Sequence, residues 1–240
     1  ILKAFKNALH FLFKNISCIL SPDITKVKKV AIALMIMDQK KVWDEIAPYW
    51  NALRSKPYKD IQKVLDSLLA RWKPGKILDI GCGNCRNLIP FNNNGFECYG
   101  IDLSSKMIKQ SKKLSKNLKL KVGSAEKLVY KKDFFDYAIH SSVVSCIEGR
   151  YKRLQSLKEA YRVLKKDGEA LVTAWNKLQP KFIFKKRDLY LPWKTNKKVY
   201  YRYYYHYFPW ELKNNLKKVG FKIIYSGNPF SKNIIFVVRK

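Results

Sequence analysis

The sequence predicts an α/β fold in which a mostly parallel, seven-stranded sheet is covered by helices and ends in an antiparallel hairpin. Between residues 76 and 174, apolar runs that fit strands alternate with stretches at helical spacing, which is typical of parallel sheets. The first of these strands runs into a glycine turn at Gly81 and Gly83. Near the end of the chain, two apolar runs flank Gly227-Asn228-Pro229, which indicates a hairpin.

The predicted elements follow in the order that such a sheet requires. Two helices come first, and the second places the apolar side chains of residues 61–69 on one face at helical spacing. Pro74-Gly75 then interrupts the chain before the first strand. The predicted strands span residues 76–80, 97–101, 118–122, 135–141, 169–174, 221–225 and 234–238. The predicted helices span residues 42–49, 61–72, 85–91, 106–116, 151–164 and 211–219.

Length and composition predict one domain with appendages. With 240 residues and 47% hydrophobic content, the chain can bury a full core. We expect an N-terminal extension over residues 1–37, a main domain over 38–240, and within it a basic, aromatic insertion on the substrate side at 176–210. No apolar run approaches the roughly twenty residues that a membrane span needs. Five cysteines, an odd number, favour free thiols in a reducing, cytoplasmic compartment.

The net charge of +31 suggests a polyanionic partner. However, lysines outnumber arginines 40 to 9, and a general compositional drift toward lysine would also produce a high net charge. The distribution of the charge is more informative. Residues 176–240 carry 16 bases and 2 acids, a net charge of +14 in about the last quarter of the chain. Eight tryptophans and tyrosines from Trp193 to Trp210 are interleaved with these bases. This combination favours a nucleic-acid surface over a merely solvated face.

The glycine turn predicts a site for an adenosine nucleoside. The segment KILDIGCGNCR places Asp79, Gly81, Gly83 and Cys85 in the pattern D-x-G-x-G-x-C, and Asp102 follows at the end of the second strand. Dinucleotide-binding folds instead carry G-x-G-x-x-G. The pattern found here, with its last glycine replaced by Cys85, resembles that of the class I S-adenosylmethionine-dependent methyltransferases. Their Rossmann-like sheet also ends in an antiparallel hairpin.

This resemblance implies a set of residues that contact S-adenosylmethionine. Asp102 would accept hydrogen bonds from the ribose hydroxyls. Ser124 takes the place of the expected acidic residue, so its hydroxyl or the backbone of Ala125 would contact the adenine. The complete predicted set is Asp79, Gly81, Gly83, Asp102, Leu103, Ser124, Ala125 and His140. Cys82 and Cys85 also form a C-x-x-C pair, but without a second pair we predict no metal site.

The segment after the fourth strand excludes two chemistries. Amino methyltransferases of nucleic acids usually carry [N/D]-P-P-[Y/F] there, and cytosine-C5 enzymes need a Pro-Cys nucleophile. This chain has His140-Ser-Ser-Val-Val-Ser-Cys146 instead. We therefore expect Cys146 to be structural.

The flanking segments resemble a narrower family, the tRNA wobble-uridine carboxymethyl methyltransferases, which are relatives of the methyltransferase domain of the AlkB-homologue tRNA enzymes. The resemblance begins with IAPYW at 46–50 and with Arg54-Ser55-Lys56-Pro57-Tyr58, which fits R-x-K-P-[W/Y]. It continues through EAYRVLKKDGEALVTAW, DLYLPWK and RYYYHYF and covers about residues 38–240. A departure is Ser145-Cys146, where related enzymes often carry a histidine pair.

The narrower resemblance implies esterification of a carboxymethyl group on the wobble uridine, in the anticodon region of tRNA. A carboxylate is already ionised at neutral pH, so the reaction needs no general base. Arg54, Lys56 and Arg202 are the candidate clamps for the substrate carboxylate and phosphates. Tyr49 and His206 are candidates for contacts with an extruded base. A small zinc-binding activator would pair with the third strand at 118–122, where lysines alternate along an exposed edge.

Two other function classes remain open on the sequence alone. Residues 176–210 could form a lid over an apolar small molecule, such as a quinone precursor, in a methyltransferase of the same superfamily. The chain could also be a tRNA-binding subunit without catalytic activity. Binding of tRNA that weakens steeply with salt would separate the first choice from the small-molecule enzyme. Failure to bind S-adenosylmethionine would favour the non-catalytic subunit.

Overall fold

The computed structural model describes residues 38–54, 56–114, 117–195 and 198–240. Residues Gln39–Lys240 form one compact unit. The extension predicted for residues 1–37 lies outside the described residues. Within the described ranges, no helix is both long and apolar enough to cross a lipid bilayer.

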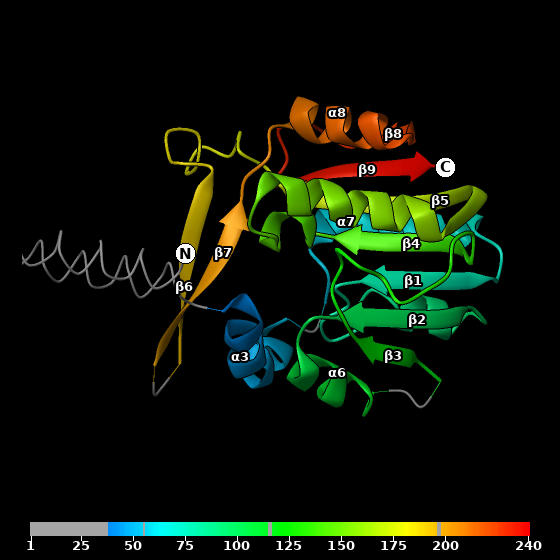
Figure 1. Ribbon diagram of the computed structural model, residues 1–240, viewed down its shortest axis with the longest axis horizontal. Helices are drawn as coiled ribbons and strands as arrows, with labels where there is room; N and C mark the ends of the chain where they lie inside the picture. The colour runs from blue at the N-terminus through cyan, green and yellow to red at the C-terminus, as the bar shows by residue number, and fades with distance from the viewer. Residues whose placement is uncertain (1–37, 55, 115–116, 196–197) are drawn as a thin grey trace, which may run out of the picture. The chain divides into compact units, whose positions relative to one another are not determined.

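The unit is built on a seven-stranded sheet with the strand order β3-β2-β1-β4-β5-β9-β8 (Figure 1). The first five strands in this order pair in parallel, whereas β9 runs antiparallel to both β5 and β8. The predicted fold class and terminal hairpin are therefore confirmed. The strands are β1 (Lys76–Ile80), β2 (Glu97–Asp102), β3 (Lys119–Val122), β4 (Phe135–Ser141), β5 (Leu164–Trp175), β8 (Lys222–Ser226) and β9 (Asn233–Arg239).

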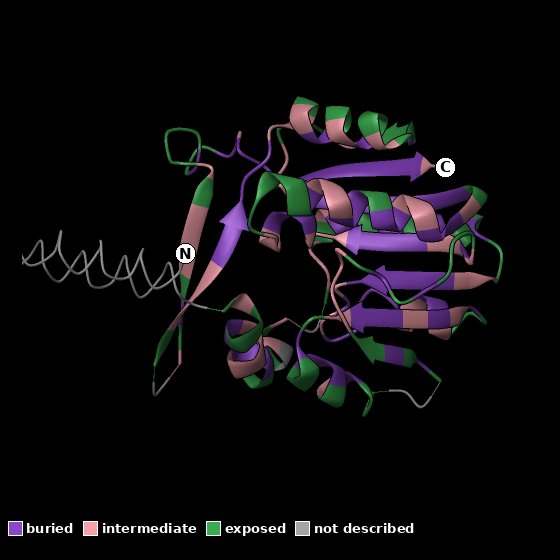
Figure 2. Cartoon of the chain, in the orientation of Figure 1, coloured by how far each residue is buried: buried purple, intermediate pink, exposed green. Residues whose placement is uncertain are grey.

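Continuous apolar runs form the central strands because helices cover both faces of the sheet. In β1, every residue after Lys76 is buried. One core cluster contains Leu78 and Ile80 together with Leu157 of a covering helix, and the other contains Ile77 with Leu65 of another helix. Figure 2 shows the central strands as buried and the edge strand β3 as largely exposed. The two faces of β1 thus belong to two separate cores.

The helices agree with the predictions except around the glycine loop and at the end of α6, where a helix was predicted over 106–116 but the helix ends at Ser111 and residues 112–114 form a turn. They are α3 (Gln39–Leu53), α4 (Lys59–Arg71), α5 (Ile89–Asn92), α6 (Ser105–Ser111), α7 (Arg150–Val163) and α8 (Pro209–Val219), with a 3-10 turn η1 (Val144–Cys146). The helix predicted at 85–91 is wrong for its first four residues. Cys85 has φ of 58° and its N–H closes a turn onto the carbonyl of Cys82 at 2.8 Å. A left-handed residue cannot begin a right-handed helix, so α5 begins only at Ile89.

Residues 176–210 contain a second sheet that the sequence analysis did not predict. Strands β6 (Asp188–Lys194) and β7 (Val199–Tyr205) form an antiparallel pair in which Trp193 lies opposite Tyr200. The run VYYRYYY lacks the alternation of apolar and polar residues that marks a half-buried strand. Four tyrosines assigned to a nucleic-acid surface are in fact buried. They are Tyr203, Tyr204, Tyr205 and Tyr207.

Helix α3 connects this second sheet to the main sheet. At its start, the Gln39 side chain accepts a hydrogen bond from the backbone N–H of Tyr203 at 2.9 Å. One turn further on, the Asp44 carboxylate accepts from the Lys106 N–H at 3.0 Å and from the Ser104 hydroxyl at 2.7 Å, at the N-terminus of α6. A carboxylate there is favoured by the helix dipole. Helix α3 is therefore fixed over the ends of β2 and β7.

Candidate functional site

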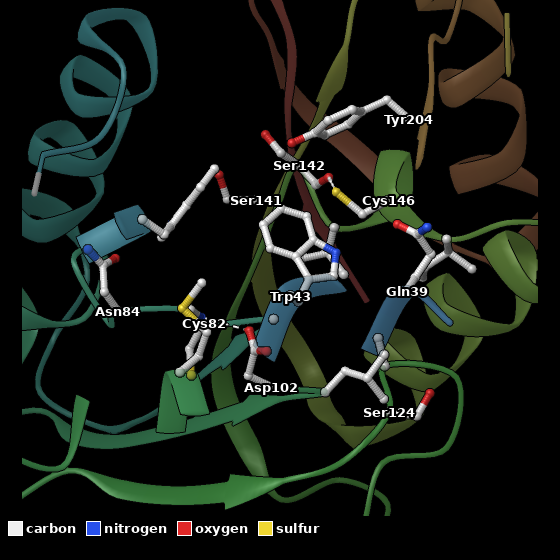
Figure 3. Close-up of a pocket in the computed structure, with 18 of the residues that line it drawn as sticks. Gln39, Trp43, Cys82, Asn84, Asp102, Ser124, Ser141, Ser142, Cys146 and Tyr204 are labelled. Atoms are coloured by element: carbon white, nitrogen blue, oxygen red, sulfur yellow. Dashed lines mark hydrogen bonds between the residues drawn. The ribbon is translucent and has the colours of Figure 1, made fainter. Parts of the chain in front are cut away.

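A pocket lies at the carboxyl ends of β1, β2 and β4, beneath α3 and β7. Ligands of open α/β sheets bind in this position, where the strand order changes direction beside β1. In Figure 3, Asp102 lies at one end of the view and Tyr204 and Cys146 at the other, with Trp43 between them. The pocket therefore has one wall from the main sheet and one from α3 and the insertion.

The glycine loop forms the floor of the pocket largely from backbone. Gly81 has φ of 68°, and its N–H donates to the carbonyl of Ile101 at 2.7 Å. A Cβ on Gly81 would come within 2.3 Å of Val143 Cγ2. Gly83 is left-handed as well, but a Cβ there would meet only Trp50 Nε1 at 3.9 Å. Gly81 is thus required by packing, whereas Gly83 leaves the chain open toward the pocket.

Asp102 is held by the main chain at the end of β2. One carboxylate oxygen accepts from the Gly83 N–H and the other from the Ser104 N–H, each at 2.8 Å. Burial raises the pKa of Asp102, and these two N–H donors oppose the increase. A carboxylate has about four acceptor positions, so two remain for a ligand. This geometry suits a pair of ribose hydroxyls.

The residues predicted to contact the adenine also lie at the pocket. Leu103, Ser124 and Ala125 all line it, and the Leu103 side chain is exposed. The Ser124 hydroxyl accepts from the Glu126 N–H at 3.1 Å and can still donate its proton. Glu126, which the sequence analysis did not select, lines the pocket too. The oriented carboxylate, the open glycine backbone and this wall fit S-adenosylmethionine.

Asp79 and His140 do not line the pocket, which corrects their predicted contacts with the cofactor. Both side chains are completely buried. Asp79 accepts a 3.4 Å hydrogen bond from the Asn87 amide, and burial raises its pKa to about 8. Burial lowers the pKa of His140 to about 4, so its ring is neutral. These residues support the glycine loop and β4 from within the core.

Aromatic side chains form the opposite wall of the pocket. Trp43 and Trp50 of α3 meet edge to face at 5.3 Å between ring centroids, and Trp50 lies 5.6 Å from Trp193 of β6. Trp175 and Tyr204 complete this wall. Such a surface can stack on a planar base.

Three arginines surround Trp50. The guanidinium carbons of Arg54, Arg86 and Arg202 lie 5.8, 6.0 and 5.9 Å from its ring centroid. Arg202 also donates to the Tyr204 hydroxyl at 2.9 Å. Among the described residues, none of the three forms an ion pair with a carboxylate. Sequence reasoning selected Arg54 and Arg202 but missed Arg86, although Arg86 belongs to the KILDIGCGNCR segment.

Of the three arginines only Arg86 lines the pocket, and Arg54, Arg202 and the remaining predicted substrate residues lie outside its lining. Lys56 is exposed, and Tyr49 is 38% exposed on α3. His206 is wholly buried, and its ring packs 4.1 Å from that of Phe182. Burial lowers the pKa of His206 to about 4. The expectation that His206 reaches an extruded base is corrected, because its ring is enclosed inside the insertion.

The cysteines at the pocket have structural contacts. Cys146 lines the pocket, donates to the carbonyl of Ser142 at 3.4 Å, and has its pKa raised to about 12 by burial. It is therefore a protonated thiol and a poor nucleophile. Cys82 and Cys85 are buried in the glycine turn. In the part of the chain that the structure describes, no three His, Cys, Asp or Glu side chains could hold a metal ion together.

Comparison with known proteins agrees with this geometry. Residues 78–172 match the family model described as a methyltransferase domain. The tRNA (carboxymethyluridine(34)-5-O)-methyltransferase of Saccharomyces cerevisiae is 29% identical over 136 residues, which are 56% of this chain and 47% of that protein. The enzyme of the same name from Arabidopsis thaliana is 32% identical over 135 residues, 56% of this chain and 32% of that protein. The matched part thus spans a third to a half of these relatives.

Solved structures share the fold. The PH0226 protein of Pyrococcus horikoshii superposes with a TM-score of 0.64 at 21% identity, covering 80% of this chain and 95% of that one. A chain from the complex of the Haloferax volcanii Trm112 methyltransferase activator with a methyltransferase has a TM-score of 0.66 at 13% identity, covering 84% and 97%. The chain therefore carries a class I, S-adenosylmethionine-dependent methyltransferase domain and resembles the tRNA carboxymethyluridine methyltransferases.

Proposed function

We propose that this protein methylates the carboxylate of a carboxymethyl group on the wobble uridine of tRNA. The observation that carries the proposal is the cluster of Arg54, Arg86 and Arg202 around Trp50, beside the cofactor pocket and without a carboxylate partner among the described residues. Guanidinium groups are well suited to binding carboxylates and phosphates in two-pronged geometry. Similarity to the yeast and Arabidopsis enzymes supports the same substrate.

The pocket suits a nucleophile that is already ionised. The Cys146 thiol remains protonated, and His140 and His206 lie outside the pocket lining. S-adenosylmethionine, when bound, would supply a methyl group on a positively charged sulfur, and a carboxylate oxygen can attack that methyl carbon without a base because the leaving group is the neutral thioether S-adenosylhomocysteine. The residues of this chain then have to orient the carboxylate and exclude water. The arginines would provide the orientation, and Trp43, Trp50 and Trp175 would enclose the base.

We also propose that a small activator protein pairs with β3. Strand β3 is at the edge of the sheet, with Lys119, Lys121 and Val122 exposed. Exposed strand edges in soluble proteins are usually covered or protected by charge. The similarity to a methyltransferase chain solved with the Trm112 activator supports this partner. Co-expression with such an activator should raise the yield of soluble protein, and a Val122→Pro variant should lose the effect, because proline removes a ladder N–H.

The decisive experiment is methyl transfer from labelled S-adenosylmethionine to bulk tRNA, followed by mass analysis of the nucleosides, with and without the activator. We expect label in the methyl ester of a carboxymethyluridine. An Asp102→Ala variant, with strongly weakened cofactor binding, is the matched control. Label found only in small molecules would refute the tRNA substrate. Absence of a thermal shift with S-adenosylmethionine would refute any catalytic role.

A further inference from the structure

A loop at residues 177–187 is built around a buried lysine. The Lys177 side chain is 4% exposed, and its ammonium group donates to the carbonyls of Phe182, Ile183 and Lys185, the second at 3.0 Å. An ammonium has three donors, and all three are used here. Burying an unpaired charge would be costly, so the loop must keep these carbonyls directed at Lys177. The ammonium thereby defines the path of the loop.

Further contacts fix the base of the loop. The Asn176 amide donates to the carbonyls of Pro229 and Ser231 at 2.7 and 2.8 Å. The Gln179 amide donates to the carbonyls of Asn176 and Lys232, each at 3.0 Å. Inside the loop, the buried Phe182 ring packs on His206. The role that the structure assigns to His206 is thus to support this loop.

The ordered loop presents an apolar side chain to solvent. Phe184 is 97% exposed, the most exposed of the large hydrophobic side chains in the described chain. Such exposure of an apolar ring is unfavourable relative to burial of the same ring. The loop backbone is ordered around a buried charge, and the loop still exposes a phenylalanine. These are the features of a preorganised binding surface, because the loop has already lost its conformational entropy before a partner binds.

The surroundings of Phe184 are cationic. Lys181, Lys185 and Lys186 are exposed, and the segment 177–187 contains no aspartate or glutamate. The loop also adjoins the pocket, because Trp175, which lines the pocket, contacts the Phe182 ring at 6.4 Å between centroids. An exposed aromatic ring among lysines is the combination that single-stranded nucleic acids bind, with bases stacked on the ring and phosphates on the cations.

We propose that Phe184 stacks on an unpaired nucleobase of the bound RNA, with Lys177 as the positioning residue that holds the loop in its binding conformation. This inference rests on the proposed function in that it takes an RNA as the substrate. It adds a binding site outside the methyl-transfer pocket. An anticodon loop that places one base in the pocket has neighbouring unpaired bases within reach of an adjoining loop.

The test measures binding of bulk tRNA to the full chain by fluorescence anisotropy at several salt concentrations. Phe184→Ala should weaken binding at least about fivefold, as loss of one stacked base does. The slope of log affinity against log salt should stay unchanged, because no charge is removed. Lys185→Ala should lower this slope by about 0.7, as expected for one phosphate contact on a single strand. Phe184→Trp should retain affinity. Leu114→Ala, which removes another exposed apolar side chain, is the matched control.

The role of Lys177 is tested by a double-mutant cycle. Lys177→Met should speed amide hydrogen exchange in the loop and weaken RNA binding, and it should add little to Phe184→Ala, because both changes remove the same contact. Additive losses would overturn the positioning role. A Phe184→Ala variant that binds tRNA as tightly as the wild type would overturn the stacking site. The stacking site would also be overturned if Phe184→Ala abolished association with anionic phosphatidylserine vesicles but left the affinity for tRNA equal to that of the wild type. If the wild type binds S-adenosylmethionine but no tRNA, the proposed function itself fails.

Discussion

The two walls of the pocket are built in different ways. The cofactor wall uses backbone groups and one carboxylate, and its main residues, Gly81 to Asp102, lie within a short stretch of chain. The other wall, which we propose faces the substrate and call the substrate wall, uses large side chains from distant segments, such as Trp50 of α3 and Trp175 of β5. Arg202 of β7 lies beside it, against Trp50. The local sequence therefore specifies the cofactor wall. The substrate wall forms only when folding brings together α3, the glycine loop and the insertion.

The largest effect should come from Asp102→Ala in the cofactor wall. The change removes the acceptor for the Gly83 and Ser104 N–H groups and for the ribose hydroxyls, and hydrogen bonds to charged groups contribute about 1.5–3 kcal/mol each. We expect S-adenosylmethionine affinity to fall by about 100-fold or more in calorimetric titrations. Affinity for tRNA should stay within about twofold. An equal loss of both affinities would show that the two walls are not separable.

The next largest effect should come from Arg202→Met beside the substrate wall. Methionine fills a similar volume but cannot bind an anion, so the KM for tRNA should rise by about tenfold, as expected for loss of one charged hydrogen bond. The Kd for S-adenosylmethionine should not change. Lys194→Met, which removes an exposed base on the same hairpin, is the control and should have little effect. An unchanged KM in Arg202→Met would remove Arg202 from the proposed clamp.

The buried carboxyl group of Asp79, which lies behind the glycine loop, should make the free energy of unfolding depend on pH. Its folded-state pKa is about 8, against about 3.9 for an unfolded aspartate. Between these values the folded state binds a proton that the unfolded state has lost, so the free energy of unfolding falls as pH rises from about 4 to about 8. The contribution is complete below about pH 4 and lost above about pH 8.

Urea unfolding of wild type and Asp79→Asn at pH 5, 6, 7 and 8 would measure this dependence. The stability difference between them should shift in favour of Asp79→Asn by up to about 1.4 kcal/mol per pH unit. His140 and His206, with pKa values lowered to about 4, act in the opposite direction in both proteins, so the comparison cancels them. A difference independent of pH would show that Asp79 is ionised in the folded protein.

The smallest effect concerns Cys85, where the sequence departs from the usual glycine. Cys85 is buried with φ of 58°, a conformation that costs a non-glycine residue about 1–2 kcal/mol. Cys85→Gly and Cys85→Ala both remove the thiol, but only glycine removes the backbone strain. The glycine variant should therefore be more stable than the alanine variant by about 1 kcal/mol in thermal unfolding. Equal stabilities would mean that the loop relaxes around Cys85 at no cost.

Much of the main sheet was predictable because its signals are local. Strands β1 and β4 begin and end at the residues predicted, and the terminal hairpin has the predicted antiparallel pairing. The same locality made Asp102 recognisable. The helix predicted to begin at Cys85 was wrong because non-local contacts determine the backbone there. The turn's N–H groups donate to the carbonyls of Cys82 and Ile101, and these hydrogen bonds override the helical propensity of the segment.

The insertion could not be derived in the same way. Its tyrosines were assigned to a surface on composition, and the structure buries Tyr203 and Tyr204 against partners from other segments. His206 was selected from its position in an aromatic run, whereas its neighbours Trp175 and Phe182 are set by the fold. Arg86 was missed because its proximity to Trp50 is not encoded in their separation along the chain.

The sequence by itself determined the fold class, the glycine loop and the carboxylate that follows β2, because backbone conformation and strand patterning depend on neighbouring residues. The tertiary structure alone decided which aromatic side chains are buried and which three arginines meet at one indole. It also decided that Lys177 is enclosed by a loop that leaves Phe184 in solvent. These features depend on contacts between segments that the fold brings together or on the burial of a charge, and neither can be read from a local sequence pattern.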